Sequence, residues 1–144
     1  MKANDPTMSV ALENDFDDAV GEIDVIPQDL SRVFVNIVNN ACYATTEKQK
    51  KGVAGYAPVV RLSTRNIGDR VEVRIRDNGS GIPDAIREKI FAPFFTTKPT
   101  GAGTGLGLSI SYDIIVQEHH GELRVDSKDG EFTEFVITLP RNNR

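Results

Sequence analysis

The sequence predicts an α+β fold, a two-layer α/β sandwich in which about three helices cover one face of a mixed, mostly antiparallel sheet of about five strands. Apolar residues recur at helical spacing after Pro27, and two pairs of strand-like segments are each joined by a short turn. With 144 residues, of which 39% are apolar, the chain has the size of a single globular domain. We expect this domain to span residues 9–140, after a disordered start at 1–8 and before a loose tail at 141–144.

The clearest local pattern is a long amphipathic helix that begins at Pro27, where Pro27 and Asp29 suit a first helical turn. Its apolar stripe repeats every three or four residues. The stripe consists of Leu30, Val33, Phe34, Ile37, Val38, Ala41 and Ala44. Cys42 lies within this pattern and is interpreted as a small core residue, because no adjacent basic residue would activate its thiol. The polar stretch 46–55 is expected to end the helix.

The other elements follow from shorter patterns. A weak strand pattern occupies 9–14, and two strands at 59–65 and 70–76 are expected to form a hairpin. In the second strand of this hairpin apolar and charged residues alternate, so that one face is buried. The remaining expected elements are, in order, a short helix over 83–90, a loop rich in Gly and Thr over 96–105, a helix that starts at Leu106 and ends near Gly121, and strands at 122–127 and 132–139.

The net charge argues against nucleic acid or an anionic membrane as the main partner. The formal net charge is -4, whereas either partner would require a basic surface. No run of about 20 apolar residues is present, and a polar stretch follows Met1. We therefore expect a cytoplasmic domain without direct membrane contact, even where the parent protein is membrane-tethered.

Two asparagines on the predicted long helix are candidate metal ligands. Asn36 and Asn40 are one turn apart at the edge of the apolar stripe, whereas Asn39 falls almost opposite the stripe. An amide oxygen is a neutral ligand that suits Mg²⁺, which takes few protein ligands beside phosphate oxygens and water. On the helix alone, ordinary surface asparagines are the more frequent explanation.

A carboxylate and two glycines follow the second strand of the predicted hairpin, in the segment 77–82. Asp77 continues the inward-facing positions of that strand, so its carboxylate is directed toward the core and needs a partner there. The exocyclic amino group of adenine would be a suitable donor. Gly79 and Gly81 would let the backbone turn sharply and approach a flat ligand. An ordinary Asp-Asn-Gly turn is the alternative.

A glycine-rich segment leads into the last predicted helix. Gly103, Gly105 and Gly107 would expose backbone N–H groups at the positive end of a helix dipole, an arrangement that binds phosphate. The segment is not a Walker loop, because no Lys-Ser or Lys-Thr pair follows the glycines. It is not a dinucleotide fingerprint either, because no strand precedes it.

Phenylalanines and a lysine precede this segment. Phe91, Phe94 and Phe95 are interpreted as anchors that hold the base of a mobile lid in the core, and plain core packing would use the same residues. Lys98 either neutralises phosphate charge or is a solvated surface charge.

Taken in this order, four segments closely resemble the catalytic and ATP-binding domain of sensor histidine kinases, in the wider superfamily that includes DNA gyrase. The segment 36–41 resembles the N box of that family, 77–82 its G1 box, 91–95 its F box and 103–108 its G2 box. The resemblance covers roughly 29–139. Four boxes in order are far more specific than any one of them.

The resemblance implies a Bergerat-type sandwich that binds ATP and Mg²⁺ between the long helix and a mobile lid. By this similarity Asp77 would accept a hydrogen bond from the adenine amino group, and Asn40 would ligate Mg²⁺. Asn36 and Lys98 would be the catalytic residues, positioning the metal and the phosphates. The implied nucleotide-binding residues are Asn36, Asn40, Tyr43, Asp77, Gly79, Gly81, Ile82, Thr97, Lys98, Gly103, Thr104, Gly105, Leu106, Gly107 and Leu108.

Two positions distinguish this chain within the superfamily. Many members carry a basic residue three positions after the metal-binding asparagine, and Tyr43 occupies that position here. Members that hydrolyse ATP carry Glu at the position that Asn36 occupies, and an amide is not a useful general base toward water. The resemblance therefore implies a protein-histidine kinase rather than a fast ATPase.

The implied phosphate acceptor is a histidine on a separate dimerisation domain of the parent kinase, from which phosphate would reach a response regulator. The two histidines of this chain, His119 and His120, are predicted to be helix-end residues that interact favourably with the helix dipole. Because dimerisation would belong to the other domain, we expect the isolated domain to be monomeric. Two alternatives stay open: a stand-alone serine kinase of the anti-sigma type, and a module that only binds nucleotide.

Overall fold

The computed structural model describes residues 10–95 and 106–142. The predicted disordered start at 1–8 and the predicted loop at 96–105 lie outside the described residues.

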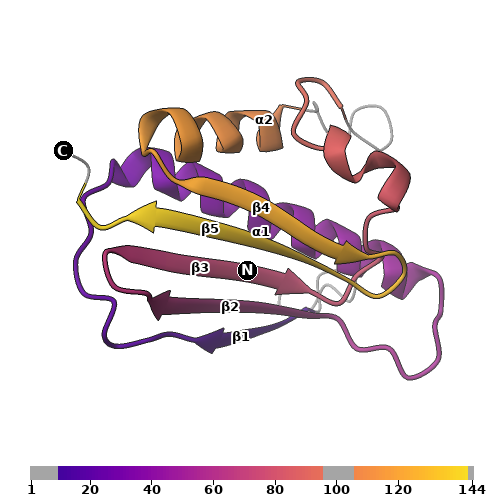
Figure 1. Cartoon of the computed structure of the whole chain (residues 1–144). Coiled ribbons are helices and arrows are strands. Elements are labelled where there is room, and N and C mark those ends of the chain that lie inside the picture. The colour runs from indigo at the N-terminus through magenta and orange to yellow at the C-terminus, as the bar shows by residue number, and fades with distance from the viewer. Residues whose placement is uncertain (1–9, 96–105, 143–144) are drawn as a thin grey trace.

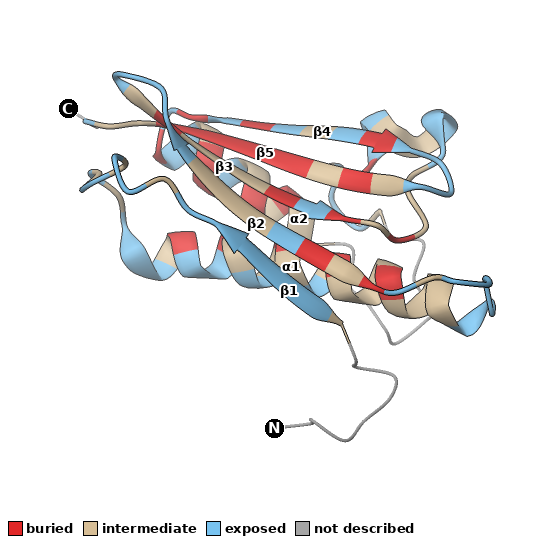
Figure 2. Cartoon of the chain, turned by 90° about the horizontal axis from the view of Figure 1, so that it is seen from below, coloured by how far each residue is buried: buried red, intermediate tan, exposed pale blue. Residues whose placement is uncertain are grey.

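One mixed sheet of five strands forms the first layer of the fold (Figure 1). Its strands lie in the order β1-β2-β3-β5-β4, with β1 parallel to β2 and every other neighbouring pair antiparallel. The strands are β1 (Ala11–Asp15), β2 (Val59–Asn66), β3 (Arg70–Asp77), β4 (Glu122–Lys128) and β5 (Phe132–Pro140). The helices form the second layer and cover one face of the sheet (Figure 2). The predicted fold class is confirmed.

The long helix α1 (Pro27–Lys50) supplies the helical side of the core. Its buried stripe, with Val33 and Ile37 fully enclosed, packs with Ile75 and Phe135 of the sheet in one apolar cluster. The helix ends at Lys50, inside the polar stretch that was expected to end it. Polar residues alone do not break a helix, and α1 stops only where Gly52 adopts a φ of +71°.

Three shorter helical segments follow. The segment η2 (Asp84–Lys89) is a 3₁₀ helix within the predicted 83–90. The helix α2 (Gly107–Tyr112) continues directly into the π-helix η3 (Asp113–Glu118), and together they fill most of the last predicted helix. Among the described residues, none of the helices combines the length and the hydropathy of a membrane-spanning segment.

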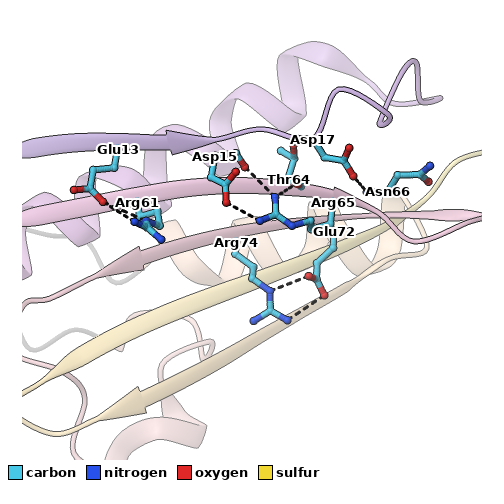
Figure 3. A network of polar contacts seen from close by, with 9 residues as sticks. All are labelled: Glu13, Asp15, Asp17, Arg61, Thr64, Arg65, Asn66, Glu72 and Arg74. Atoms are coloured by element: carbon cyan, nitrogen blue, oxygen red, sulfur yellow. Dashed lines mark hydrogen bonds and ion pairs between the residues drawn. The ribbon is translucent and has the colours of Figure 1, made fainter.

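The outer face of the sheet carries charged side chains that pair within and across strands (Figure 3). Between β1 and β2, Arg61 binds Glu13 at 3.0 Å and Arg65 binds Asp15 at 2.6 Å. Further into the sheet, Arg74 binds two glutamates. Exposed ion pairs contribute only about 0.2–1 kcal/mol each. Their main effect here is to keep this face polar and to favour one register of β1 on β2.

The two ends of the domain differ from the prediction. The first strand runs over Ala11–Asp15 rather than 9–14, and it is a parallel edge strand. Arg141, predicted to lie in a loose tail, is held in place: its guanidinium donates hydrogen bonds to the backbone oxygen of Val20 and to Asn66 Oδ1. This residue therefore ties the turn after β2 to the segment that precedes α1.

His119 lies at the end of η3, as predicted, but it is buried, which corrects the helix-dipole interaction predicted for it. The residue is 1% exposed. Its Nε2 accepts a hydrogen bond from the Ile26 N–H at 2.9 Å, and its Nδ1 lies 2.8 Å from the backbone oxygen of Ile114. Because a carbonyl oxygen only accepts, Nδ1 carries the proton. The ring is therefore uncharged in this arrangement and links the start of α1 to η3, instead of acting as a cation on the helix dipole.

We expect His119→Ala to lower the free energy of unfolding by about 2–4 kcal/mol. The Ile26 N–H loses its acceptor, the Ile114 oxygen keeps only the His119 backbone N–H as a donor, and a cavity replaces the ring. Urea denaturation measures the change. His120→Asn is the matched control, since His120 is exposed at a φ of +58° that asparagine tolerates, and it should change stability by less than about 0.5 kcal/mol. Equal losses of stability in the two variants would contradict the structural role assigned to the His119 ring.

Candidate functional site

One cavity of about 680 Å³ lies between α1, the turn after β3, η2 and the start of α2. Asp77 and Asn40, which come from different elements, both line it. Eight of the residues predicted for the site lie in its wall. They are Asn36, Asn40, Tyr43, Asp77, Gly81, Ile82, Gly107 and Leu108.

Asp77 ends β3 with its side chain on the buried face of the sheet. The register places it between Val60 on β2 and Thr133 on β5, and it is 3% exposed. Its Oδ1 accepts a hydrogen bond from the Gly79 N–H at 2.8 Å, and no other donor to the carboxylate lies among the described residues. Burial raises the pKa of Asp77 to about 6, and the Gly79 N–H opposes this shift. The second oxygen, Oδ2, is therefore an acceptor that a ligand in the cavity can satisfy.

Gly79 and Gly81 allow two close approaches around this turn. A Cβ on Gly79 would lie 2.7 Å from the backbone carbon of Ala44, so glycine lets the turn rest directly on α1. Gly81 has a φ of +70°, and a Cβ there would collide with the backbone oxygen of Lys128. The second glycine therefore lets the turn that joins β4 and β5 pack against the segment after Asp77.

We expect Gly81→Ala to destabilise the domain by more than about 2 kcal/mol and to weaken nucleotide binding, because the clash involves backbone that cannot give way. Gly68→Ala is the matched control: its φ of +88° is also positive, but nothing lies within 4 Å of a Cβ there. That variant should lose only about 1 kcal/mol. Thermal unfolding and nucleotide titration are measured for both variants. The difference between them gives the effect of the contact between Gly81 and the Lys128 oxygen, because both variants share the strain of a positive φ. Similar losses of stability in both variants would contradict the importance of the close approach at Gly81.

Polar residues on one side of α1 form a continuous row along the cavity. Asn36, Asn40 and Tyr43 belong to it, and Glu47 and Lys51 extend it beyond the predicted site. Asn39, which helical geometry directs away from the core, is exposed and still reaches the rim of the cavity. The preference for Asn40 as the inward-facing residue stays a prediction.

The amide of Asn36 has a defined orientation. Its Nδ2 lies 3.3 Å from the backbone oxygen of Gly107 and 3.4 Å from Ser111 Oγ. A carbonyl can only accept, so the nitrogen must face α2, and the amide oxygen is the group left for the cavity. Asn36 therefore joins α1 to the first turn of α2 and can offer an acceptor to a bound cation or to a water molecule.

The predicted aromatic anchor consists of two phenylalanines rather than three. The Phe91 ring lies 5.5 Å from the ring of Tyr112 and 6.3 Å from that of Phe135, and Phe95 lines the cavity. Phe94 is 74% exposed, with a φ of +66°, so it does not pack into the core. The aromatic packing fixes the segment that precedes residue 96.

The other predicted site residues fall into two groups. Gly79 is buried and contacts Asp77 through its N–H, and Leu106 lines an adjoining groove. Thr97, Lys98, Gly103, Thr104 and Gly105 lie outside the described residues.

Several residues of the cavity wall were not predicted. Ala44, Glu47 and Lys51 continue the helical spacing of Asn36 and Asn40, so extending that periodicity would have found them. Thr133 and Phe135 come from β5. No local pattern marks these two, because their place beside the cavity depends on how β3 and β5 pair.

Known proteins are similar to this chain in sequence and in fold. Residues 25–143 match the family described as histidine kinase-, DNA gyrase B- and HSP90-like ATPase. The chain is 36% identical over 132 residues to sporulation kinase E of Bacillus subtilis and 48% identical over 87 residues to sensor kinase CckA of Brucella abortus. These matches cover 92% and 59% of this chain, and 16% and 9% of those kinases. Among solved structures, the catalytic domain of the histidine kinase ThkA has a TM-score of 0.77 at 30% identity, covering 94% of this chain and 82% of that one.

The chain belongs to the histidine kinase-, DNA gyrase B- and HSP90-like ATPase family, a family whose members bind ATP. Within this family its likeness is to the catalytic domains of sensor histidine kinases. It spans about a sixth of the length of sporulation kinase E, 16%.

Proposed function

We propose that the chain is the catalytic domain of a two-component sensor histidine kinase and transfers the γ-phosphate of Mg²⁺-ATP to a histidine on a separate dimerisation domain. The observation that carries this proposal is the shared cavity, where a buried carboxylate, Asp77, and the amides of Asn36 and Asn40 face one space. A cytoplasmic location is part of the proposal, because ATP and response regulators are found there.

Adenine fits the Asp77 end of the cavity. Its exocyclic amino group donates hydrogen bonds and so complements the open oxygen of the carboxylate, whereas guanine presents an acceptor at the same position. Ile82, Ile86 and Ile90 line the same cavity and offer apolar surface for a flat base. This end of the cavity therefore favours adenine among the purines.

The asparagine end of the cavity fits a metal and phosphates. Asn40 and Asn36 can offer amide oxygens, neutral ligands that Mg²⁺ accepts beside phosphate oxygens and water. When bound, Mg²⁺ neutralises charge that develops on the transferred phosphoryl group. Neither asparagine can take a proton from water, so this pair does not activate hydrolysis, and the phosphate is kept for another nucleophile.

A groove next to the cavity offers an approach for the acceptor. It has a volume of about 430 Å³ and lies between α1 and α2, where Val35 and Ile110 line it. It shares Asn36 and Gly107 with the cavity. An acceptor segment in this groove would therefore meet the nucleotide at its phosphate end. We further propose that a response regulator receives the phosphate from that segment and does not contact this cavity.

The test is phosphoryl transfer in trans. The purified domain is mixed with the histidine-bearing domain of the parent kinase, γ-labelled ATP and Mg²⁺. We expect label on the added domain that is lost in acid and stable in alkali, as for phosphohistidine. Acid-stable label on a serine would favour the serine kinase alternative. Absence of transfer despite intact ATP binding would favour a module that only binds nucleotide.

A further inference from the structure

Asn78 follows Asp77 directly, yet its side chain is directed away from the cavity. Its Oδ1 accepts hydrogen bonds from the Val59 N–H at 2.8 Å and from the Tyr56 hydroxyl at 3.2 Å. Its Nδ2 donates to the backbone oxygen of Ala57 at 2.8 Å. All three partners lie where the chain enters β2, so this side chain holds the end of β3 against the start of β2.

These contacts supply a missing step of the ladder between β2 and β3. A hydrogen-bonded antiparallel pair normally exchanges two backbone N–H···O bonds. Between Val59 and Asn78, the Asn78 N–H donates to the Val59 oxygen at 3.2 Å, but the return bond comes to the Asn78 side chain. Pairing therefore extends one residue beyond Asp77, while the main chain is free to turn at Gly79.

An amide at this position meets partners of opposite kinds. The Val59 N–H can only donate and the Ala57 oxygen can only accept, so the orientation of the Asn78 amide is determined by its neighbours. Burial raises the pKa of Tyr56 to about 12, so its hydroxyl keeps its proton and remains a donor at neutral pH. Aspartate would place an acceptor against the Ala57 oxygen, and alanine would remove all three bonds.

A second set of contacts braces the same turn from the opposite side. Lys48 Nζ lies 4.9 Å from the centroid of the Tyr56 ring and donates to the Gly130 oxygen at 2.7 Å. The Gly130 N–H in turn donates to the Ser80 oxygen at 2.6 Å. The turn after β3 is thus held between the start of β2 and the turn that joins β4 and β5, with Asp77 at its base.

We propose that Asn78 is a positioning residue for adenine selection: by extending the pairing of β2 and β3 past Asp77, it sets the direction from which the carboxylate meets the purine. The inference rests on the proposed function and adds to it a residue that does not line the cavity. Hydrogen bonds weaken steeply when they are misaligned. A displaced turn therefore impairs recognition of the purine 6-position more than it impairs binding of the triphosphate.

The test is the ratio of the affinities for ATP and ITP, measured by calorimetry with Mg²⁺ at pH 7.5. The two nucleotides carry the same triphosphate and differ only at the 6-position and N1 of the purine, so the effect of a change in protein charge on the triphosphate cancels in the ratio. We expect Asn78→Ala and Asn78→Asp each to lower the ratio at least about fivefold. The aspartate variant nearly keeps the side-chain volume, so it covers a failure of the alanine variant to fold.

Val71→Ala is the matched control, because Val71 is 1% exposed at the opposite end of β3. It lowers stability and should leave the ratio within about twofold of the wild type. An unchanged ratio in either folded Asn78 variant overturns the inference, and so does a ratio that falls equally in Val71→Ala. Asp77→Asn in the same assay tests the adenine recognition by Asp77 separately from the positioning role of Asn78. If it keeps the wild-type ratio, the proposed adenine recognition fails and the role of Asn78 fails with it.

Discussion

Asp77→Asn is expected to weaken ATP binding by roughly a hundredfold or more, since each 1.4 kcal/mol is tenfold in affinity. In the native turn Oδ1 accepts the Gly79 N–H at 2.8 Å, which leaves Oδ2 for the proposed hydrogen bond from the adenine amino group. An amide has a single oxygen. When that oxygen serves Gly79, its NH₂ group faces the adenine amino group, and two donors oppose each other.

The same NH₂ group complements the 6-oxo group of hypoxanthine, so Asp77→Asn should bind ITP as well as the wild type does, or better. Calorimetry with both nucleotides provides the measurement. ATP affinity equal to that of the wild type would remove Asp77 from the base site.

The Asp77→Asn domain without nucleotide is also expected to be more stable than the wild type at neutral pH. Burial raises the pKa of Asp77 from 3.8 to about 6, so the folded state disfavours the ionised carboxyl. Between about pH 4 and pH 6 the folded protein retains a proton that the unfolded chain has lost. Wild-type stability therefore falls as pH rises through this window, by up to about 3 kcal/mol.

Asparagine has no proton to lose, so the stability difference between variant and wild type should open between about pH 4 and pH 6 and stay constant above. Urea denaturation at a series of pH values measures it. A difference that is the same at pH 4 and at pH 7.5 would contradict the buried charge as its cause. Loss of binding together with a gain in stability would identify Asp77 as a residue kept for function at a cost in stability.

Asn40→Ala is expected to slow phosphoryl transfer to an added histidine domain by roughly a hundredfold, because the metal would lose one of its proposed amide ligands and its position against the phosphates. Binding of ATP in the presence of a chelator should remain near that of the wild type, since adenine recognition does not involve this amide. Transfer rates at a series of Mg²⁺ concentrations provide the measurement.

Asn39→Ala is the matched control for Asn40. Asn39 is the adjacent amide, lies at the rim of the same cavity and is exposed. This variant should transfer phosphate at a rate within about threefold of the wild type. Equal losses of activity in the two variants would contradict the prediction that Asn40, and not Asn39, is the metal ligand.

The features that could be predicted from the sequence have local patterns. Helical spacing placed Val33 and Ile37 on the buried face of α1, where both are fully enclosed. Alternation along β3 directed Asp77 inward, where it is 3% exposed. In both cases neighbouring residues of one element carry the information, because a side chain on a regular helix or strand has only a few possible directions.

The features that could not be predicted depend on contacts between distant segments. His119 is an ordinary helix-end residue by its local sequence, and its burial follows from hydrogen bonds to Ile26 and Ile114. Thr133 belongs to the cavity because the register of β5 sets it opposite Asp77. The direction of β1 has no local pattern either, since a short exposed strand fits a parallel or an antiparallel neighbour equally well.

The strand order has a consequence for how the domain is completed during synthesis. In the sheet β5 lies between β3 and β4, although it is made after both, and it supplies Thr133 and Phe135 to the cavity. A nascent chain that has reached only β4 has no strand for β4 to pair with, and it lacks the two cavity residues that β5 supplies. A ligand that needs the whole cavity wall would therefore bind the finished sheet, and by mass action the proposed nucleotide would favour the complete domain over its unfinished forms.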